Sequence, residues 1–504
     1  MTQKRILKSV KYGKTLLTTS DMIGSTLNKG LQMTEPFAPF LAMLQSPDLI
    51  ATLRDSVIGE GKEFEGAYGP RKLIYADYVA SGRALRQVET FMIEHVLPFY
   101  GNTHTETSHC GAATTRLREG ARETITRICG ADDQFSTVFT GSGATAGLNR
   151  MVLLLGTAEA VAAGRPVRVF VGPYEHHSNI LPWRESGAEV IEIAEAPNGG
   201  PDLVQLAEKL AASPPDAIKI GTFSIASNVT GIVTNADVVT RLLKAHGAIA
   251  IWDYAGGGPY LPIDMCAGTD AQKDVVVLSP HKFLGGPGAS GVMIINRAVV
   301  ARQIPVFPGG GTVLFVSPWA QDYSKDIATR EEGGTPNIVG DIRAALCFLV
   351  KEAIGQQAMD ERHAAHDQRA RAVWDKNPAI EIMGNTSAEQ RLPFFSLRIK
   401  NGFGGYRLYQ EFTALLSDHY GIQARGGCAC AGPYAHRLLG IEHEASEQLR
   451  REILGGNEET KPGWTRLNLS VLTSDAKADF IIKAVDALAR GKIPATGDAN
   501  SCAA

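Results

Sequence analysis

The chain has 504 residues and a formal net charge of −3 at pH 7, from 50 basic and 53 acidic residues. This balance gives no reason to expect nucleic acid or a membrane surface as a partner, and the length predicts more than one domain. No apolar run approaches the roughly 20 residues that a membrane-spanning helix needs, so we expect a globular protein.

Residues 1–70 are expected to form a mainly helical extension that ends in a glycine-rich loop over Gly59–Gly69. The start of the chain is basic and carries no acid. This fits an organellar transit segment or, as we favour, a solvated basic terminus. Seven cysteines are few for this length and odd in number, which argues against a disulfide-rich secreted protein. We expect a reducing compartment, the cytoplasm.

Short β-branched or apolar runs alternate with helical patterns from residue 71 to 335. The predicted strands are Ser136–Thr140, Val167–Val171, Ile218–Phe223, Ala248–Trp252, Val275–Leu278 and Gly291–Ile295. Apolar residues recur at helical spacing between them, as in Ala113–Cys129. This alternation predicts a large α/β domain with a mostly parallel sheet covered on both faces. Ligands of such sheets bind beyond the carboxyl ends of the strands.

A smaller α+β domain is predicted over residues 336–492, where the rhythm of the pattern changes. Asn337 is expected to cap a long helix, a charged helix follows over 357–375, and Ser474 begins the last helix. The predicted strands of this domain are Phe394–Ile399, Ile422–Arg425 and Arg466–Ser470. The small and polar residues 493–504 are predicted to be a disordered tail.

Glycine is the compositional outlier, with 53 residues against a typical share of about 7%. One cluster lies in Phe139–Thr145, where a predicted strand enters a Gly-Ser-Gly turn and then a helix. Such a turn lets the backbone approach a ligand, and a helix N-terminus attracts an anion. Considered alone, the segment is equally consistent with an ordinary tight turn.

Asp253 ends one predicted strand, and Lys282 follows the next one within Ser279–Gly288. A carboxylate at this edge is costly without a cationic partner, which a protonated pyridine nitrogen would supply. A partly desolvated lysine has a lowered pKa and can form a Schiff base. Alone, Asp253 fits a helix N-cap equally well and Lys282 fits a surface loop, but with the phosphate turn they match a pyridoxal-phosphate site.

Several motifs in order give the chain a more specific resemblance. They are Tyr100–His104, Glu175–Asn179, Ser227–Gly231, Ser279–Lys282, Glu332–Asn337 and Arg425–Pro433. With these motifs the chain resembles the class V aminotransferase family of fold type I and, within it, the cysteine desulfurases and selenocysteine lyases. The resemblance covers roughly residues 71–490.

The resemblance implies pyridoxal 5′-phosphate as cofactor. Lys282 would bind it covalently, Asp253 would pair with its ring nitrogen, and His176 would stack on the ring and transfer protons. Asn228 would lie near the ring hydroxyl. The residues implied at the phosphate are Gly143, Ala144, Thr145, Ser279 and His281.

The resemblance also implies a homodimer and an amino-acid substrate. Thr335 would reach the phosphate in the neighbouring subunit. Arg466 would bind the substrate carboxylate, and Arg425 and Asn179 would lie beside the substrate. His176 and its neighbour His177 could be a metal pair, but adjacent residues rarely face one ion, so we expect no metal.

Cys430 has the spacing of the family's persulfide-forming cysteine, five residues after Arg425. A nearby arginine favours the thiolate that attacks the substrate sulfur. Cys428 is expected to be an inert thiol; a disulfide or a metal clip are its alternatives. The leading hypothesis is therefore a cysteine desulfurase that converts L-cysteine to L-alanine and passes the sulfur to a protein acceptor.

Two positions depart from the family. Gly256 stands where the desulfurases usually carry a glutamine, and Gly-Gly-Cys-Ala precedes Cys430 in place of a histidine-bearing loop. These departures leave open a lyase, epimerase or aminotransferase acting on another amino acid. A catalytically silent scaffold of the same fold is the third hypothesis, and the presence of Lys282 and Asp253 argues against it.

Overall fold

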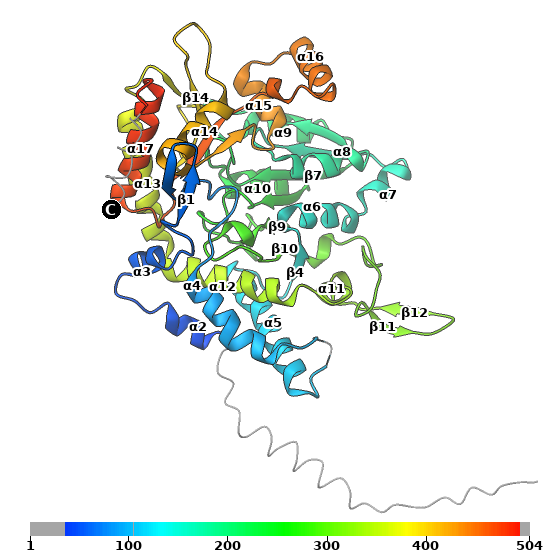
Figure 1. Cartoon of the computed structure of the whole chain (residues 1–504). Helices are drawn as coiled ribbons and strands as arrows, with labels where there is room; N and C mark the ends of the chain where they lie inside the picture. Colours follow the sequence, from blue (N-terminus) through cyan, green and yellow to red (C-terminus); the bar gives the residue numbers. More distant parts are fainter. Residues whose placement is uncertain (1–35, 104, 494–504) are drawn as a thin grey trace, which may run out of the picture.

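The computed structural model describes residues 36–103 and 105–493, and its centre is a seven-stranded sheet (Figure 1). In spatial order the strands are β4 (Phe135–Gly141), β10 (Gly291–Asn296), β9 (Val275–Leu278), β8 (Ile249–Asp253), β7 (Ile218–Ser224), β5 (Val167–Val171) and β6 (Glu189–Glu192). β10 is antiparallel to both of its neighbours, and the other adjacent pairs are parallel. The predicted α/β fold with a mostly parallel sheet is confirmed.

Side chains of the central strands alternate between two apolar layers. On β9, Val276 and Leu278 join the core on one face, whereas Val275 and Val277 join the core on the other. The first face is covered by α4 (Arg86–Phe91), α5 (His109–Ile128), α9 (Leu203–Ala211), α10 (Ala236–Ala245) and α12 (Ile338–Ile354). The second is covered by α6 (Gly143–Leu154), α7 (Thr157–Ala162), α8 (Leu181–Glu185) and α11 (Ile327–Glu331).

A second, antiparallel sheet has its own core. Its order is β13 (Ile380–Ile382), β14 (Phe394–Ile399), β17 (Trp464–Asn468) and β16 (Arg425–Gly427). The helices packed on it are α13 (Gln356–Trp374), α14 (Tyr409–Tyr420) and α17 (Asp475–Ala489). The predicted helix caps are confirmed. The Asn337 side chain accepts a hydrogen bond from the Gly340 N–H at the start of α12, and the Ser474 side chain accepts one from the Lys477 N–H at the start of α17. α12 itself packs on α5 in the core of the large sheet (Figure 1).

The N-terminal part of the described chain is tied to both cores. α2 (Ala38–Met43) and α3 (Leu49–Asp55) pack into the core of the large sheet. A hairpin of β1 (Glu63–Gly66) and β2 (Gly69–Lys72) forms where we expected a loop, and β3 (Ile74–Tyr75) then pairs in parallel with β15 (Ile422–Gln423). The expectations for the basic terminus and the tail lie outside the described residues, and the division into domains stays a prediction.

The remaining elements lie at the periphery. A hairpin of β11 (Val313–Val316) and β12 (Gln321–Tyr323) projects from the body of the molecule (Figure 1). α15 (Gly432–Leu439) and α16 (His443–Leu454) follow the predicted cysteine loop. The single-turn helices are η1 (Met92–Val96), η2 (Leu97–Phe99), η3 (His177–Asn179), η4 (Pro280–Lys282), η5 (Arg297–Val299) and η6 (Glu458–Thr460). Over the described ranges, no helix has the length and apolar character required to cross a membrane.

Candidate active site

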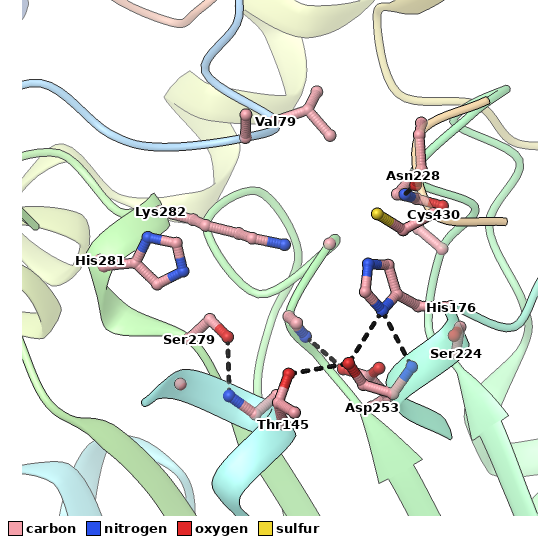
Figure 2. Close-up of a pocket in the computed structure, with 18 of the residues that line it drawn as sticks. Val79, Thr145, His176, Ser224, Asn228, Asp253, Ser279, His281, Lys282 and Cys430 are labelled. Carbon is pink, nitrogen blue, oxygen red and sulfur yellow. Dashed lines mark hydrogen bonds between the residues drawn. The ribbon is translucent and has the colours of Figure 1, made fainter. Parts of the chain in front are cut away.

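A cavity of about 230 Å³ opens at the carboxyl edge of the large sheet and is also lined by Arg425 of β16 and Arg466 of β17. Figure 2 labels ten of its lining residues. Most of the predicted site residues line it: Gly143, Ala144, Thr145, His176, Asn228, Asp253, Ser279, His281, Lys282, Arg425, Cys430 and Arg466. They come from segments far apart in the sequence. The cavity is therefore the place where the predicted chemistry would converge.

The N-terminus of α6 forms one wall of the cavity. Its N-cap Ser142 makes no side-chain cap, and the Ala144 N–H donates to the Ser279 hydroxyl at 2.9 Å. Gly143 has a φ of +61°, and a Cβ there would lie 2.8 Å from the same hydroxyl. Only glycine fits this close approach. A helix start with a serine and His281 beside it suits a phosphate group.

Asp253 at the end of β8 and Lys282 in η4, which follows the neighbouring strand β9, face the same cavity (Figure 2). Burial lowers the pKa of the Lys282 amine to about 8, opposed by the attraction of Asp253. Burial also raises the pKa of Asp253, which accepts a hydrogen bond from the Ala255 N–H at 2.7 Å. A buried carboxylate of this kind is stabilised by a cation, and a protonated ring nitrogen fits that need.

His176 is held in one orientation by hydrogen bonds to its Nδ1. This atom accepts from the Ser178 N–H at 3.1 Å, and the Ser178 hydroxyl, itself 2.7 Å from Thr145 Oγ1, lies 3.1 Å away. Burial lowers the pKa of His176 to about 4, so the ring is neutral near pH 7. Since Nδ1 accepts a backbone N–H, the proton of the neutral ring is on Nε2.

Cys430 lies on a loop with unusual backbone geometry. Ala429 and Cys430 have φ values of +55° and +56°, a region that residues with a Cβ rarely adopt. Asn228 Nδ2 donates to the Ala429 carbonyl at 2.7 Å, while Asn228 Oδ1 is buried without a hydrogen-bond partner. Cys430 is exposed and Cys428 is partly buried, and both are free thiols. The loop therefore presents the Cys430 sulfur to the cavity (Figure 2).

The two predicted arginines share a partner that the sequence did not reveal. Arg466 Nη2 donates to Asp77 Oδ1 at 2.8 Å, and Arg425 Nε donates to Asp77 Oδ2 at 3.0 Å. Arg466 Nη1 donates to the carbonyl of Asn228, and its Nε is buried without a partner. No motif identified Asp77, because its role depends on contacts across most of the chain.

Two predicted residues lie away from the cavity. Asn179 is fully buried and donates to Glu175 Oε2 at 2.6 Å, while its oxygen accepts from Thr222. Its position fits support of Glu175, whose pKa burial raises to about 7, and not direct contact with a substrate. Thr335 is exposed and accepts a hydrogen bond from Asn102 at 3.4 Å.

Gly256, the position at which the resemblance implies a departure from the desulfurases, lines the cavity. A Cβ at this position would lie 3.4 Å from the Ala226 carbonyl oxygen, which is ordinary contact. A side chain would thus be tolerated, and glycine leaves the space open. Among the described residues, no group of three or more His, Cys, Asp or Glu side chains is arranged to hold a metal ion.

Comparison with known proteins identifies the family. The model of the family "Aminotransferase class-V" matches residues 74–448. A protein from Streptomyces coelicolor named probable cysteine desulfurase is 25% identical over 405 residues, which cover 78% of this chain and 92% of the relative. A protein of the same name from Halalkalibacterium halodurans is 27% identical over 367 residues, which cover 72% of this chain and 84% of that relative.

A solved structure shows the same fold. The apo cysteine desulfurase of Thermococcus onnurineus superposes with a TM-score of 0.72 at 22% identity, covering 87% of this chain and 98% of that one. The chain belongs to the class V aminotransferase family. It is a pyridoxal-phosphate-dependent enzyme, and the α6 turn, Asp253 and Lys282 fit that cofactor.

Proposed function

We propose that the protein is a cysteine desulfurase, which converts L-cysteine to L-alanine and stores the sulfur as a persulfide on Cys430. The observation that carries the proposal is that Cys430 lines the same cavity as Lys282 and Asp253. An exposed thiol at the cofactor site has no role in a simple transamination. The names of the Streptomyces and Halalkalibacterium relatives support the same activity.

Lys282 and His176 would transfer protons, whereas Cys430 would accept the sulfur. Bound pyridoxal phosphate would supply the electron sink for carbanion chemistry at the substrate Cα. The Lys282 amine, with its pKa lowered to about 8, can accept and return a proton at Nζ near neutral pH. His176 holds a further proton on Nε2 within the cavity. Arg466 binds the substrate carboxylate.

Sulfur transfer balances without an external oxidant. The Cys430 thiolate attacks the substrate sulfur and forms an S–S bond as the Cβ–S bond breaks. The electron pair of the broken bond remains with Cβ, which takes up a proton to give the methyl group of alanine. Cysteine and one enzyme thiol thus become alanine and one enzyme persulfide.

The proposal extends to partners and location. Thr335 lies outside the cavity of its own chain, which supports a homodimer in which it reaches the neighbouring site. Cys430 is exposed, which supports transfer of the persulfide sulfur to a protein acceptor. The small number of cysteines supports a location in the reducing environment of the cytoplasm.

The test is a single-turnover reaction of the holoenzyme with L-cysteine in the absence of a reductant. We expect one alanine per active site and one additional sulfur atom on the peptide that contains Cys430, detected by mass spectrometry. Cys430→Ser should abolish both, whereas Cys428→Ser and Cys110→Ser should retain them. Alanine and sulfide formation that survives Cys430→Ser would contradict the persulfide mechanism and favour another reaction of the family.

A further inference from the structure

The two cavity arginines face one another directly across a pair of strands. β16 and β17 are antiparallel, and their register places Arg425 opposite Arg466. Like charges in such a position destabilise a sheet. Both arginines also line the cavity. The arrangement therefore requires a negative charge close to both side chains.

Asp77 supplies that charge from behind the cavity. β3 pairs with β15 in parallel, with Tyr75 opposite Gln423, and two residues further along each chain lie Asp77 and Arg425. Each carboxylate oxygen of Asp77 accepts from one arginine, at 2.8 Å from Arg466 and at 3.0 Å from Arg425. Asp77 is only 8% exposed and is not among the residues that line the cavity. It acts as a fixed counter-ion for both arginines.

The side chains of Arg425, Arg466 and Asp77 can together neutralise only one negative charge on a bound ligand. The side chains of Arg425, Arg466 and Asp77 together carry one net positive charge. This charge can be neutralised by one α-carboxylate of a bound amino acid. In the proposed function the substrate side chain extends toward Cys430, which lies on the loop that follows β16 and is five residues after Arg425. If Arg425 were not neutralised, its charge would attract an acidic group on that side chain.

We propose that Asp77 is a specificity-determining residue, which makes the cavity select amino acids with an uncharged side chain over those with an acidic one. The proposal rests on the proposed function in one respect, that the substrate is an amino acid whose side chain reaches Cys430. It adds a substrate class, set by the pairing of Asp77 with Arg425 and Arg466.

The test compares the binding of L-alanine and L-aspartate to the holoenzyme, followed through the visible absorption of the bound cofactor. Neither ligand contains sulfur, so the result does not depend on desulfurase activity. In Asp77→Asn the ratio of the two dissociation constants should move toward L-aspartate by about tenfold or more. Asp475→Asn is the matched control, since Asp475 also bridges two arginines, Arg362 and Arg369, away from the cavity.

A double variant completes the experiment. Asp77→Asn combined with Arg425→Gln restores one net positive charge and removes the opposed pair, so the ratio should return toward that of the wild type. An unchanged ratio in Asp77→Asn, or a ratio that stays shifted in the double variant, would overturn the proposal. If Asp77→Asn alone does not fold, the double variant should fold and keep the wild-type ratio; its failure to fold would also count against the proposal. A wild-type enzyme that binds both ligands but forms no Cys430 persulfide would refute the proposed function and leave this test intact.

Discussion

His177 holds Cys430 through its backbone N–H, which donates to the Cys430 carbonyl at 2.9 Å. The ring of the same histidine accepts a hydrogen bond at Nε2 from the Gly432 N–H at 2.8 Å. One residue thus binds the backbone of this loop at Cys430 and again two residues further on, at Gly432. Positive φ values at two consecutive residues with a Cβ cost about 1–3 kcal/mol each, so these bonds help to keep the loop in a conformation that it would not adopt alone.

Replacement of His177 should therefore slow sulfur transfer more than cofactor binding. In His177→Leu the Gly432 N–H loses its acceptor, and we expect persulfide formation on Cys430 to slow by about tenfold or more, because small displacements of a reacting atom are costly. In His177→Gln an amide oxygen can replace Nε2, and most of the rate should return. The measurement is alanine release in a single turnover, with the cofactor absorption as the control. Equal rates in His177→Leu and the wild type would show that the hydrogen bond from the Gly432 N–H to the His177 ring is dispensable.

Some residues of the site could be predicted from the sequence because they follow buried strands, and others because they belong to ordered motifs. Asp253 and Lys282 are recognisable because an acid and a lysine stand where apolar runs end, and parallel strands bring such positions to one edge. Asp77 could not be predicted, because its partner Arg466 lies 389 residues away and the contact depends on the register of β3 with β15. The edge strand β6 could not be predicted for a different reason. Its sequence, Glu-Val-Ile-Glu, is short and does not alternate between apolar and polar residues, and its two ends are exposed.

The projecting hairpin predicts the oligomeric state. On β11 and in its turn, Leu314, Val316 and Trp319 are 71%, 66% and 90% exposed, and a patch of this kind is typical of an interface. Trp319→Ser combined with Leu314→Ser should shift a dimer toward the monomer, measured by light scattering after gel filtration. If Thr335 reaches the neighbouring site, the affinity for pyridoxal phosphate should fall together with the dimer. Leu454→Ser, at an exposed leucine on α16, is the control, and a monomeric wild type would refute the proposed homodimer.

His363 predicts a dependence of stability on pH. Burial lowers its pKa to about 3, and neither ring nitrogen has a hydrogen-bond partner. Between roughly pH 6.5 and that value the unfolded chain binds a proton that the folded chain does not, so His363 lowers stability by about 1.4 kcal/mol per pH unit as the pH falls. His363→Phe should therefore raise the free energy of unfolding and flatten its decline between pH 6 and pH 4. His443→Phe, at an exposed position on α16, should leave the slope unchanged; the same slope in His363→Phe and the wild type would contradict the prediction.

Lys351 supports the glycine-rich segment Gly256–Gly258. Its Nζ donates to the Gly258 carbonyl at 2.6 Å and also to the Leu261 carbonyl, and burial lowers its pKa to about 7. Lys351→Met would leave both carbonyls without this donor, at a cost of about 1–3 kcal/mol in the free energy of unfolding. Because the segment continues from Asp253 through Gly256, we also expect weaker binding of pyridoxal phosphate, measured by titration of the apoenzyme.

The pH dependence of stability distinguishes the loss of the Lys351 amine from a simple loss of packing. Above about pH 7 the folded protein releases a proton from Lys351 that the unfolded chain keeps up to its ordinary value near 10.4, so this group makes the wild type more stable as the pH rises across that interval. The stability difference between the wild type and Lys351→Met should therefore grow from pH 7 to pH 9 in denaturant titrations. Lys483→Met, at an exposed position on α17, should show no such growth. A difference that stays constant with pH would mean that Lys351 keeps its proton in the fold and acts only through its two hydrogen bonds.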